Sequence, residues 1–194
     1  MGIFKASELR SLAENSTLLK SRVNKSQAAG QILFAEAKNA VKPADIFLSH
    51  SSLDATYIYG LKLKFESYGY GVYIDWIDDA QLDRRNVTLA TANTIKERMR
   101  SAKCLFFAVS SNASNSKWMP WELGFMDGLR GRAAICPIEL SNMTSNDFKG
   151  QEYLGVYPYI TEEGIKDQNR KTLWVNRNPK TYVRFSEWLQ GNSV

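Results

Sequence analysis

Short, uninterrupted apolar runs alternate with amphipathic stretches along most of the chain after Pro43, and this rhythm restricts the folds open to it. The amphipathic stretches carry apolar residues three or four positions apart, which is typical of helices. Runs that are apolar throughout, rather than at alternate positions, indicate strands buried on both faces, as in parallel sheets covered by helices. We therefore predict a doubly wound α/β domain whose first strands are residues 45–49, 71–75, 103–109 and 133–140.

The 194 residues fit one domain with an appendage. Residues 1–43 have helical spacing that stops at Pro43, so we predict an N-terminal extension of one or two helices. These helices pack either on the main domain, which is the commoner arrangement, or on a partner. Residues 44–194 form the domain itself, with a core at about 44–160 and a tail at 161–194. Within the region after Leu140 we expect edge strands at 157–160 and 173–175 and a final helix at 182–189.

Composition excludes several classes of protein. No stretch is apolar for long enough to span a membrane, and charged residues interrupt the first 20 positions where a secretory signal would be apolar, so we expect a soluble, cytoplasmic protein. Cys104 and Cys136 lie inside apolar runs, which indicates two buried thiols. With His50 as the single histidine, we expect no metal site. The net charge of +5 is spread over both flanks, so we expect no nucleic-acid partner.

Polar residues at the ends of the predicted strands are candidates for a binding site, because doubly wound sheets bind ligands beyond the carboxyl ends of their strands. Ser49 and His50 follow the first strand, Asp75 and Trp76 follow the second, and Ser110 follows the third. Each also has an ordinary structural interpretation. His50 can simply end a strand, Asp75 can belong to a solvated acidic loop, and Ser110 can be a turn residue.

The stretch from Ser114 to Asp127 is the most informative, although common catalytic motifs such as G-x-S-x-G and G-x-x-x-x-G-K-[ST] are absent. Ser116 can cap a helix in which Pro120 occupies the first turn. Trp118 and Glu122 then share one face, and a neighbouring stripe is predicted to anchor the helix to the sheet, namely Trp121, Phe125 and Leu129. Glu122 is either a functional carboxylate or an acid stabilised by the helix dipole, and its spacing leaves both interpretations open.

Three segments resemble bacterial TIR domains: Ala44-Asp-Ile-Phe-Leu-Ser-His-Ser51, the Asp75-Trp76 loop, and the Trp118-x-x-x-Glu122 pattern. The resemblance covers about residues 44–160, and within the group the chain is most similar to TIR proteins of the Thoeris anti-phage defence system. It implies a flavodoxin-like, five-stranded parallel sheet in the order 2-1-3-4-5. It also implies an enzyme that cleaves the nicotinamide–ribose bond of NAD+, an NAD+ nucleosidase and ADP-ribosyl cyclase with Glu122 as the catalytic residue.

By this resemblance NAD+ is the substrate, no cofactor is needed, and the product is a cyclic ADP-ribose isomer that reaches a partner effector by diffusion. Glu122 would stabilise an oxocarbenium-like ribose, as carboxylates do in glycoside hydrolysis. Trp118 or Trp76 would stack on a base, while Ser49, His50 and Ser110 would hold ribose or phosphate oxygens. The alternatives are a non-catalytic TIR scaffold that acts by self-association and a transferase that processes nucleosides. The loop after the second strand lacks the proline and glycine of many receptor-type TIR domains. We therefore do not predict that this chain has the adaptor-binding surfaces of those domains.

Overall fold

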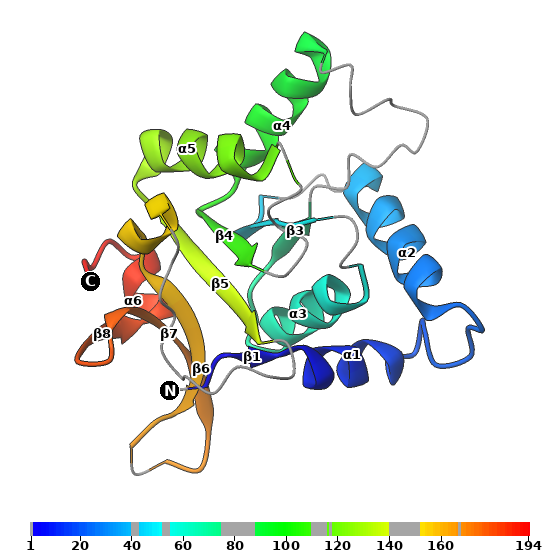
Figure 1. The fold of residues 1–194 in the computed structure, drawn as a ribbon, viewed down its shortest axis with the longest axis horizontal. Coiled ribbons are helices and arrows are strands. Elements are labelled where there is room, and N and C mark those ends of the chain that lie inside the picture. The colour runs from blue at the N-terminus through cyan, green and yellow to red at the C-terminus, as the bar shows by residue number, and fades with distance from the viewer. Residues whose placement is uncertain are drawn as a thin grey trace.

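A computed structural model of the chain describes residues 2–39, 43–51, 55–74, 88–109, 116, 118–139, 152–166 and 168–194 (Figure 1). In these ranges the strands are β1 (Phe4–Lys5), β2 (Ile46–Ser49), β3 (Val72–Ile74), β4 (Cys104–Val109), β5 (Ala133–Glu139), β6 (Tyr159–Gly164), β7 (Lys171–Asn178) and β8 (Thr181–Arg184). The helices are α1 (Ala6–Glu14), α2 (Lys25–Asn39), α3 (Ala55–Ser67), α4 (Leu89–Ser101), α5 (Trp118–Arg130), the short 3-10 helix η3 (Glu152–Val156) and α6 (Phe185–Leu189).

The central sheet has the order β3-β2-β4-β5-β6, and every neighbouring pair in this part runs parallel. Counted along the domain, these strands are 2-1-3-4-5, so the predicted flavodoxin-like topology is confirmed. The apolar runs explain why the strands take inner positions. All four residues of β2 are buried, and five of the six in β4 are buried. Strands of this kind need a helical layer on each face.

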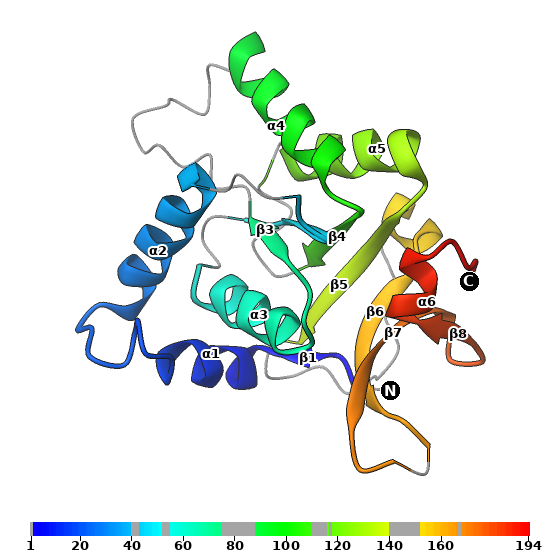
Figure 2. The same cartoon turned by 180° about the vertical axis from the view of Figure 1, so that it is seen from behind.

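Two hydrophobic clusters occupy the two faces of the sheet (Figures 1 and 2). Leu48 points into the cluster that contains side chains of α1, α2, α3 and α6, and Phe47 points into the cluster beneath α4 and α5. Successive side chains of a strand point to opposite faces, so each strand serves both clusters. Cys104 and Cys136 are buried in the first cluster as free thiols, as the sequence predicted.

The N-terminal segment is joined to the sheet by β1. Phe4 pairs with Ile138 in parallel register, and the carbonyl of Gly2 accepts a hydrogen bond from the backbone N–H of Glu162 on β6 (3.2 Å). Strands β5 and β6 pair directly at one point only, Ile135 with Tyr159, so β1 fills the space where the two strands separate. The first residues of the chain are therefore part of the sheet.

Helix α1 packs closely against α3, as expected for an extension that packs on the domain. The contact depends on a glycine, because a Cβ added at Gly60 would lie 2.1 Å from the carbonyl oxygen of Leu9. Leu9 and Ala13 are buried in the first cluster together with Leu33 of α2. Both N-terminal helices thus contribute to the core of the domain.

The tail differs from the sequence prediction. Strands β6, β7 and β8 form an antiparallel extension at the edge of the sheet, and both predicted edge strands are longer than expected. Residues 182–184, predicted as helix, belong to β8, where Val183 pairs with Val175 of β7. Backbone hydrogen bonds to β7 outweigh the helical spacing there. The final helix is therefore only α6, which begins at Phe185.

The predicted anchoring stripe of α5 is confirmed only in part, because Trp121 and Phe125 are half-buried and pack against the cluster beneath α4 and α5 without filling its interior. The apolar side chains that α5 buries are Met119, Leu123 and Met126, one helical step away from Trp121, Phe125 and Leu129. Trp121 and Phe125 stack on each other with ring centroids 5.8 Å apart, and their outer faces carry cations of α4, while Leu129 is exposed. Aromatic rings covered by cationic side chains can remain at the edge of the core, so the flexible methionines fill its interior.

Within the described ranges, no helix has the length and apolar character needed to cross a membrane.

Candidate active site

Helix α5 begins as the sequence predicted. The Ser116 hydroxyl oxygen accepts a hydrogen bond from the backbone N–H of Met119 (3.3 Å), and Pro120 lies in the first turn, where its missing N–H costs nothing. Gly131, with a φ of 59°, follows the last residue of the helix. The helix lies against β2, β4 and β5, which directs its inner face toward the carboxyl ends of the first two.

Glu122 is one turn into α5 and points inward. Its side chain accepts a hydrogen bond at Oε2 from the Ser49 hydroxyl, and Ser49 is the last residue of β2. Both residues are buried, with exposed fractions of 5% for Glu122 and 1% for Ser49. The two are 73 positions apart in the sequence, so no local pattern indicated this contact. Ser49 is one of the predicted site residues, and the structure adds that its hydroxyl holds the carboxylate of Glu122.

The environment of Glu122 shifts its proton affinity. Burial raises the pKa of Glu122 from 4.5 to about 7, and the hydrogen bond from Ser49 opposes that shift. No cation in the described ranges forms an ion pair with it. A helix dipole acting alone on a solvated acid would lower its pKa. The burial and the raised pKa of Glu122 are instead typical of carboxylates at functional sites, so the geometry favours the functional interpretation, and the role of Glu122 stays a prediction.

The strands around Glu122 end at one edge of the sheet. Ile74 of β3 pairs with Leu48, and Phe107 of β4 pairs with Ser49. Three other candidates follow these strands in the sequence and lie outside the described residues: Asp75, Trp76 and Ser110. Their roles remain predictions.

His50 and Trp118 are close in sequence to the hydrogen-bonded pair of Ser49 and Glu122. His50 directly follows Ser49, is half-buried, and has its Nδ1 within hydrogen-bonding distance of the Leu48 carbonyl (3.2 Å), an arrangement in which the ring nitrogen donates. Trp118 lies one turn before Glu122, and its half-buried ring meets Trp121 edge to face with centroids 5.4 Å apart. The structure therefore places Ser49, His50 and Trp118 near the start of α5 or at the end of β2, and their contacts with a substrate remain untested.

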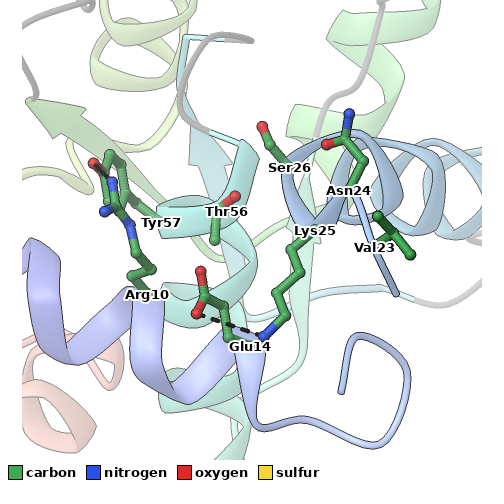
Figure 3. Close-up of a pocket in the computed structure, with 8 residues that line it drawn as sticks. All are labelled: Arg10, Glu14, Val23, Asn24, Lys25, Ser26, Thr56 and Tyr57. Atoms are coloured by element: carbon green, nitrogen blue, oxygen red, sulfur yellow. Dashed lines mark hydrogen bonds and ion pairs between the residues drawn. The ribbon is translucent and has the colours of Figure 1, made fainter. Parts of the chain in front are cut away.

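A cavity of about 570 Å³ lies elsewhere in the described part of the chain (Figure 3). It lies between α1, the start of α2 and the start of α3. Arg10 reaches across it to the hydroxyl of Tyr57 (2.5 Å), and Lys25 pairs with Glu14 (3.6 Å). These contacts brace the N-terminal helices against α3, and Glu122 does not line this cavity.

Comparison with known proteins gives two informative matches. The chain is 45% identical over 194 residues to a protein of Bacillus cereus (strain MSX-D12) named "Probable 3' cyclic ADP-D-ribose synthase ThsB'", a match that covers 99% of this chain and 100% of that protein. It is also 31% identical over 102 residues to a candidate cyclic ADP-D-ribose synthase, TIR2, of Cytobacillus dafuensis. That second match covers 52% of this chain and 26% of that protein. No protein-family model matches the chain.

Proposed function

The chain belongs to the bacterial TIR proteins that are cyclic ADP-D-ribose synthases, and from this membership we propose that Glu122 is the carboxylate with which it cleaves NAD+ and closes ADP-ribose into a ring. One observation carries the proposal: a buried glutamate, hydrogen-bonded by Ser49, lies at the edge of the sheet where β2, β3 and β4 end. Doubly wound folds bind nucleotides at that edge.

The first step breaks the bond between ribose C1 and the nicotinamide nitrogen. The bonding electron pair leaves with nicotinamide, whose positively charged ring becomes neutral, and the ribose is left with oxocarbenium character. An ionised Glu122 near the ribose stabilises that charge, and burial increases the effect because little water screens it. Ser49 keeps the carboxylate in place and lowers its pKa, which favours the ionised form.

The second step decides the product. A hydroxyl of the same ADP-ribose attacks C1 and loses its proton, which a carboxylate can accept, so the ring closes without water. If this chain makes the 3' cyclic isomer named for the Bacillus cereus protein, that nucleophile is a ribose 3'-hydroxyl. If water attacks first, the product is linear ADP-ribose. Trp118, at the start of α5, is suited to stack on a base and so limit access of water.

The biological role follows from the resemblance to Thoeris proteins. We propose that the chain acts in the cytoplasm during phage infection and that its cyclic product diffuses to an effector protein. Self-association would be the means by which infection orders the active site.

The test compares nicotinamide release in lysates of infected cells that express wild-type chain, Glu122→Gln or Glu97→Gln. Glu97→Gln is the matched control, because it makes the same chemical change at an exposed position of the neighbouring helix α4. We expect wild type and Glu97→Gln to release nicotinamide and yield a new cyclic nucleotide on chromatography. Glu122→Gln should lose at least 100-fold in rate, the order of magnitude that one electrostatic group supplies.

Equal release and equal protection in Glu122→Gln and wild type would refute the catalytic assignment and favour a scaffold that acts by self-association. Release without a cyclic product would keep Glu122 as the cleaving group and refute cyclisation. Turnover of free deoxynucleosides in place of NAD+ would instead indicate a nucleoside-processing transferase.

A further inference from the structure

The cavity of about 570 Å³ between the N-terminal helices and α3 has walls that the core holds in place (Figure 3). The backbones of α1 and α3 meet closely at Leu9 and Gly60, and Leu33 of α2 is buried in the same cluster as Leu9. That cluster lies on one face of the sheet, and the apolar residues of α5 belong to the cluster on the other face. The cavity is therefore preformed, and it is separate from the site at Glu122.

The cavity contains a positive charge at Arg10 that no carboxylate of the described residues neutralises. Arg10 donates from Nη2 to the Tyr57 hydroxyl oxygen (2.5 Å), and its guanidinium lies 5.1 Å from the centroid of the Tyr57 ring. A guanidinium has five N–H donors, so this uncharged partner orients it and leaves donors for a ligand. Lys25, in contrast, pairs with Glu14 (3.6 Å). The uncompensated charge of the lining is thus that of Arg10.

Hydroxyl groups surround this charge. Ser26, Thr56 and Tyr57 line the cavity; Ser26 is exposed and the other two are half-buried, so all three side chains are accessible to solvent. The Tyr57 hydroxyl accepts from Arg10 and keeps its own proton to donate. Arg10 and Tyr57 lie on one side, Ser26 lies on the other, and Thr56 lies between them (Figure 3). A planar guanidinium beside several hydroxyl donors is a combination that binds phosphate oxygens.

The remaining lining suits a polar ligand that is larger than a phosphate ion. Glu14 contacts Lys25 through Oε2, and its carboxylate can still accept hydrogen bonds from sugar hydroxyls. Among the described residues that line the cavity, Val23 alone is aliphatic, and Arg10 lies over the ring of Tyr57. The volume lies within the range of about 300–1,000 Å³ that is typical of sites for small ligands. The lining therefore matches a phosphorylated sugar better than an apolar ring.

We propose that this cavity binds a sugar phosphate. The phosphate lies against Arg10 and the hydroxyls of Ser26 and Thr56, and a sugar hydroxyl donates to Glu14. Ribose 5-phosphate and AMP share this chemistry and differ in whether a base is attached. The binding is independent of the catalytic assignment of Glu122, which does not line the cavity.

The test uses the ¹⁵N-labelled full chain and follows the backbone N–H groups of Ser26 and Tyr57 by NMR at constant ionic strength. The probes are ribose 5-phosphate and AMP. Their matched analogues without phosphate are ribose and adenosine, and inorganic phosphate tests the ion alone. We expect a saturable shift at both reporters with at least one sugar phosphate, and binding weaker by about tenfold or more for its analogue and for inorganic phosphate. A difference between ribose 5-phosphate and AMP shows whether the base contributes.

Three variants test the assignment to the cavity. Arg10→Gln removes the charge and should weaken binding about tenfold or more. Arg100→Gln on α4 is the matched control, because Arg100 is also exposed and lies over an aromatic ring, that of Phe125 (5.7 Å), outside the cavity. It should bind like wild type. Thr56→Val removes one hydroxyl without changing the charge and should weaken binding about threefold or more.

Four results would overturn the proposal. They are the absence of a saturable shift with both sugar phosphates, equally tight binding of the analogues without phosphate, equally tight binding of inorganic phosphate, and equal binding by Arg10→Gln and Arg100→Gln. Shifts confined to α5 would also overturn it, because they would place the sugar phosphate at the site of Glu122. None of the probes contains the nicotinamide–ribose bond, so failure here leaves the proposed catalytic role of Glu122 untouched.

Discussion

Replacing Glu122 with glutamine should stabilise the protein at alkaline pH and leave its stability almost unchanged at acidic pH. Glutamine has nearly the shape of a protonated glutamate and can still accept the hydrogen bond of Ser49. The substitution therefore removes one property, the ability to ionise in a buried position. The effect can be calculated from the pKa of Glu122, which is about 7 in the fold against 4.5 for an ordinary glutamate.

The direction follows from proton linkage. Between pH 4.5 and 7 the folded chain keeps a proton on Glu122 that the unfolded chain has already lost, so stability falls as the pH rises through this interval. A shift from 4.5 to about 7 corresponds to about 3 kcal/mol when ionisation is complete, and most of this develops between pH 5 and pH 8. Glu122→Gln does not incur this loss. Its gain over wild type should therefore grow by about 2–3 kcal/mol across the same interval.

Urea unfolding of wild type, Glu122→Gln and the exposed control Glu97→Gln at pH 5, 6, 7 and 8 measures this difference. The control should differ from wild type by the same small amount at every pH. A stability difference between Glu122→Gln and wild type that does not change with pH would refute the argument, because it would mean that the carboxyl ionises in the fold as it does in water. A loss of stability that grows with pH would mean that an unrecognised cation pairs with Glu122.

Three further predictions follow from the same structure. The rate of nicotinamide release should rise with pH with an apparent pKa of about 7, and Ser49→Ala should move that midpoint upward in a pH–rate profile, because the Ser49 hydrogen bond lowers the pKa of Glu122. Gly60→Ala should destabilise the fold by about 1–3 kcal/mol in chemical unfolding, because the added carbon meets the backbone of α1. The control Gly128→Ala on α5 meets nothing and should stabilise the fold by about 0.5–1 kcal/mol. Equal effects of the two substitutions would contradict the close contact between Gly60 and α1. Phe4→Ala should cost about 3–5 kcal/mol, since this ring is buried against Phe65, and a loss below about 1 kcal/mol would show that β1 is not held in the sheet.

The parallel part of the sheet was predictable because its signal is local. Residues 46–48 and 104–109 are apolar at every position, and such runs are typical of the interior of a sheet covered on both faces. The start of α5 was predictable for a similar reason, since Ser116 and Pro120 act within one helical turn. The resemblance to TIR proteins then supplied the strand order, which no single run contains.

The features that were missed depend on distant contacts. Ser49 and Glu122 come into contact only when β2 and α5 are packed together, so no spacing in the sequence predicts their hydrogen bond. Val183 lies in a stretch that was predicted as a helix, yet it pairs with Val175 and is part of a strand. On α5 two neighbouring stripes are both apolar, and their spacing does not indicate that Met119, Leu123 and Met126 are the fully buried one. Tertiary contacts outweighed local preference in all of these cases.

The position of β1 has a consequence for how the chain is made. Phe4 is synthesised 134 positions (138 − 4) before its partner Ile138. At about 5–20 residues per second, a ribosome needs roughly 7–27 s to add that partner. During this interval β1 has no strand to pair with, and the ring of Phe4 has no complete core to enter. Strand β1 therefore leaves the ribosome before β2, β3 and β4, yet the strand that it pairs with is made after all three.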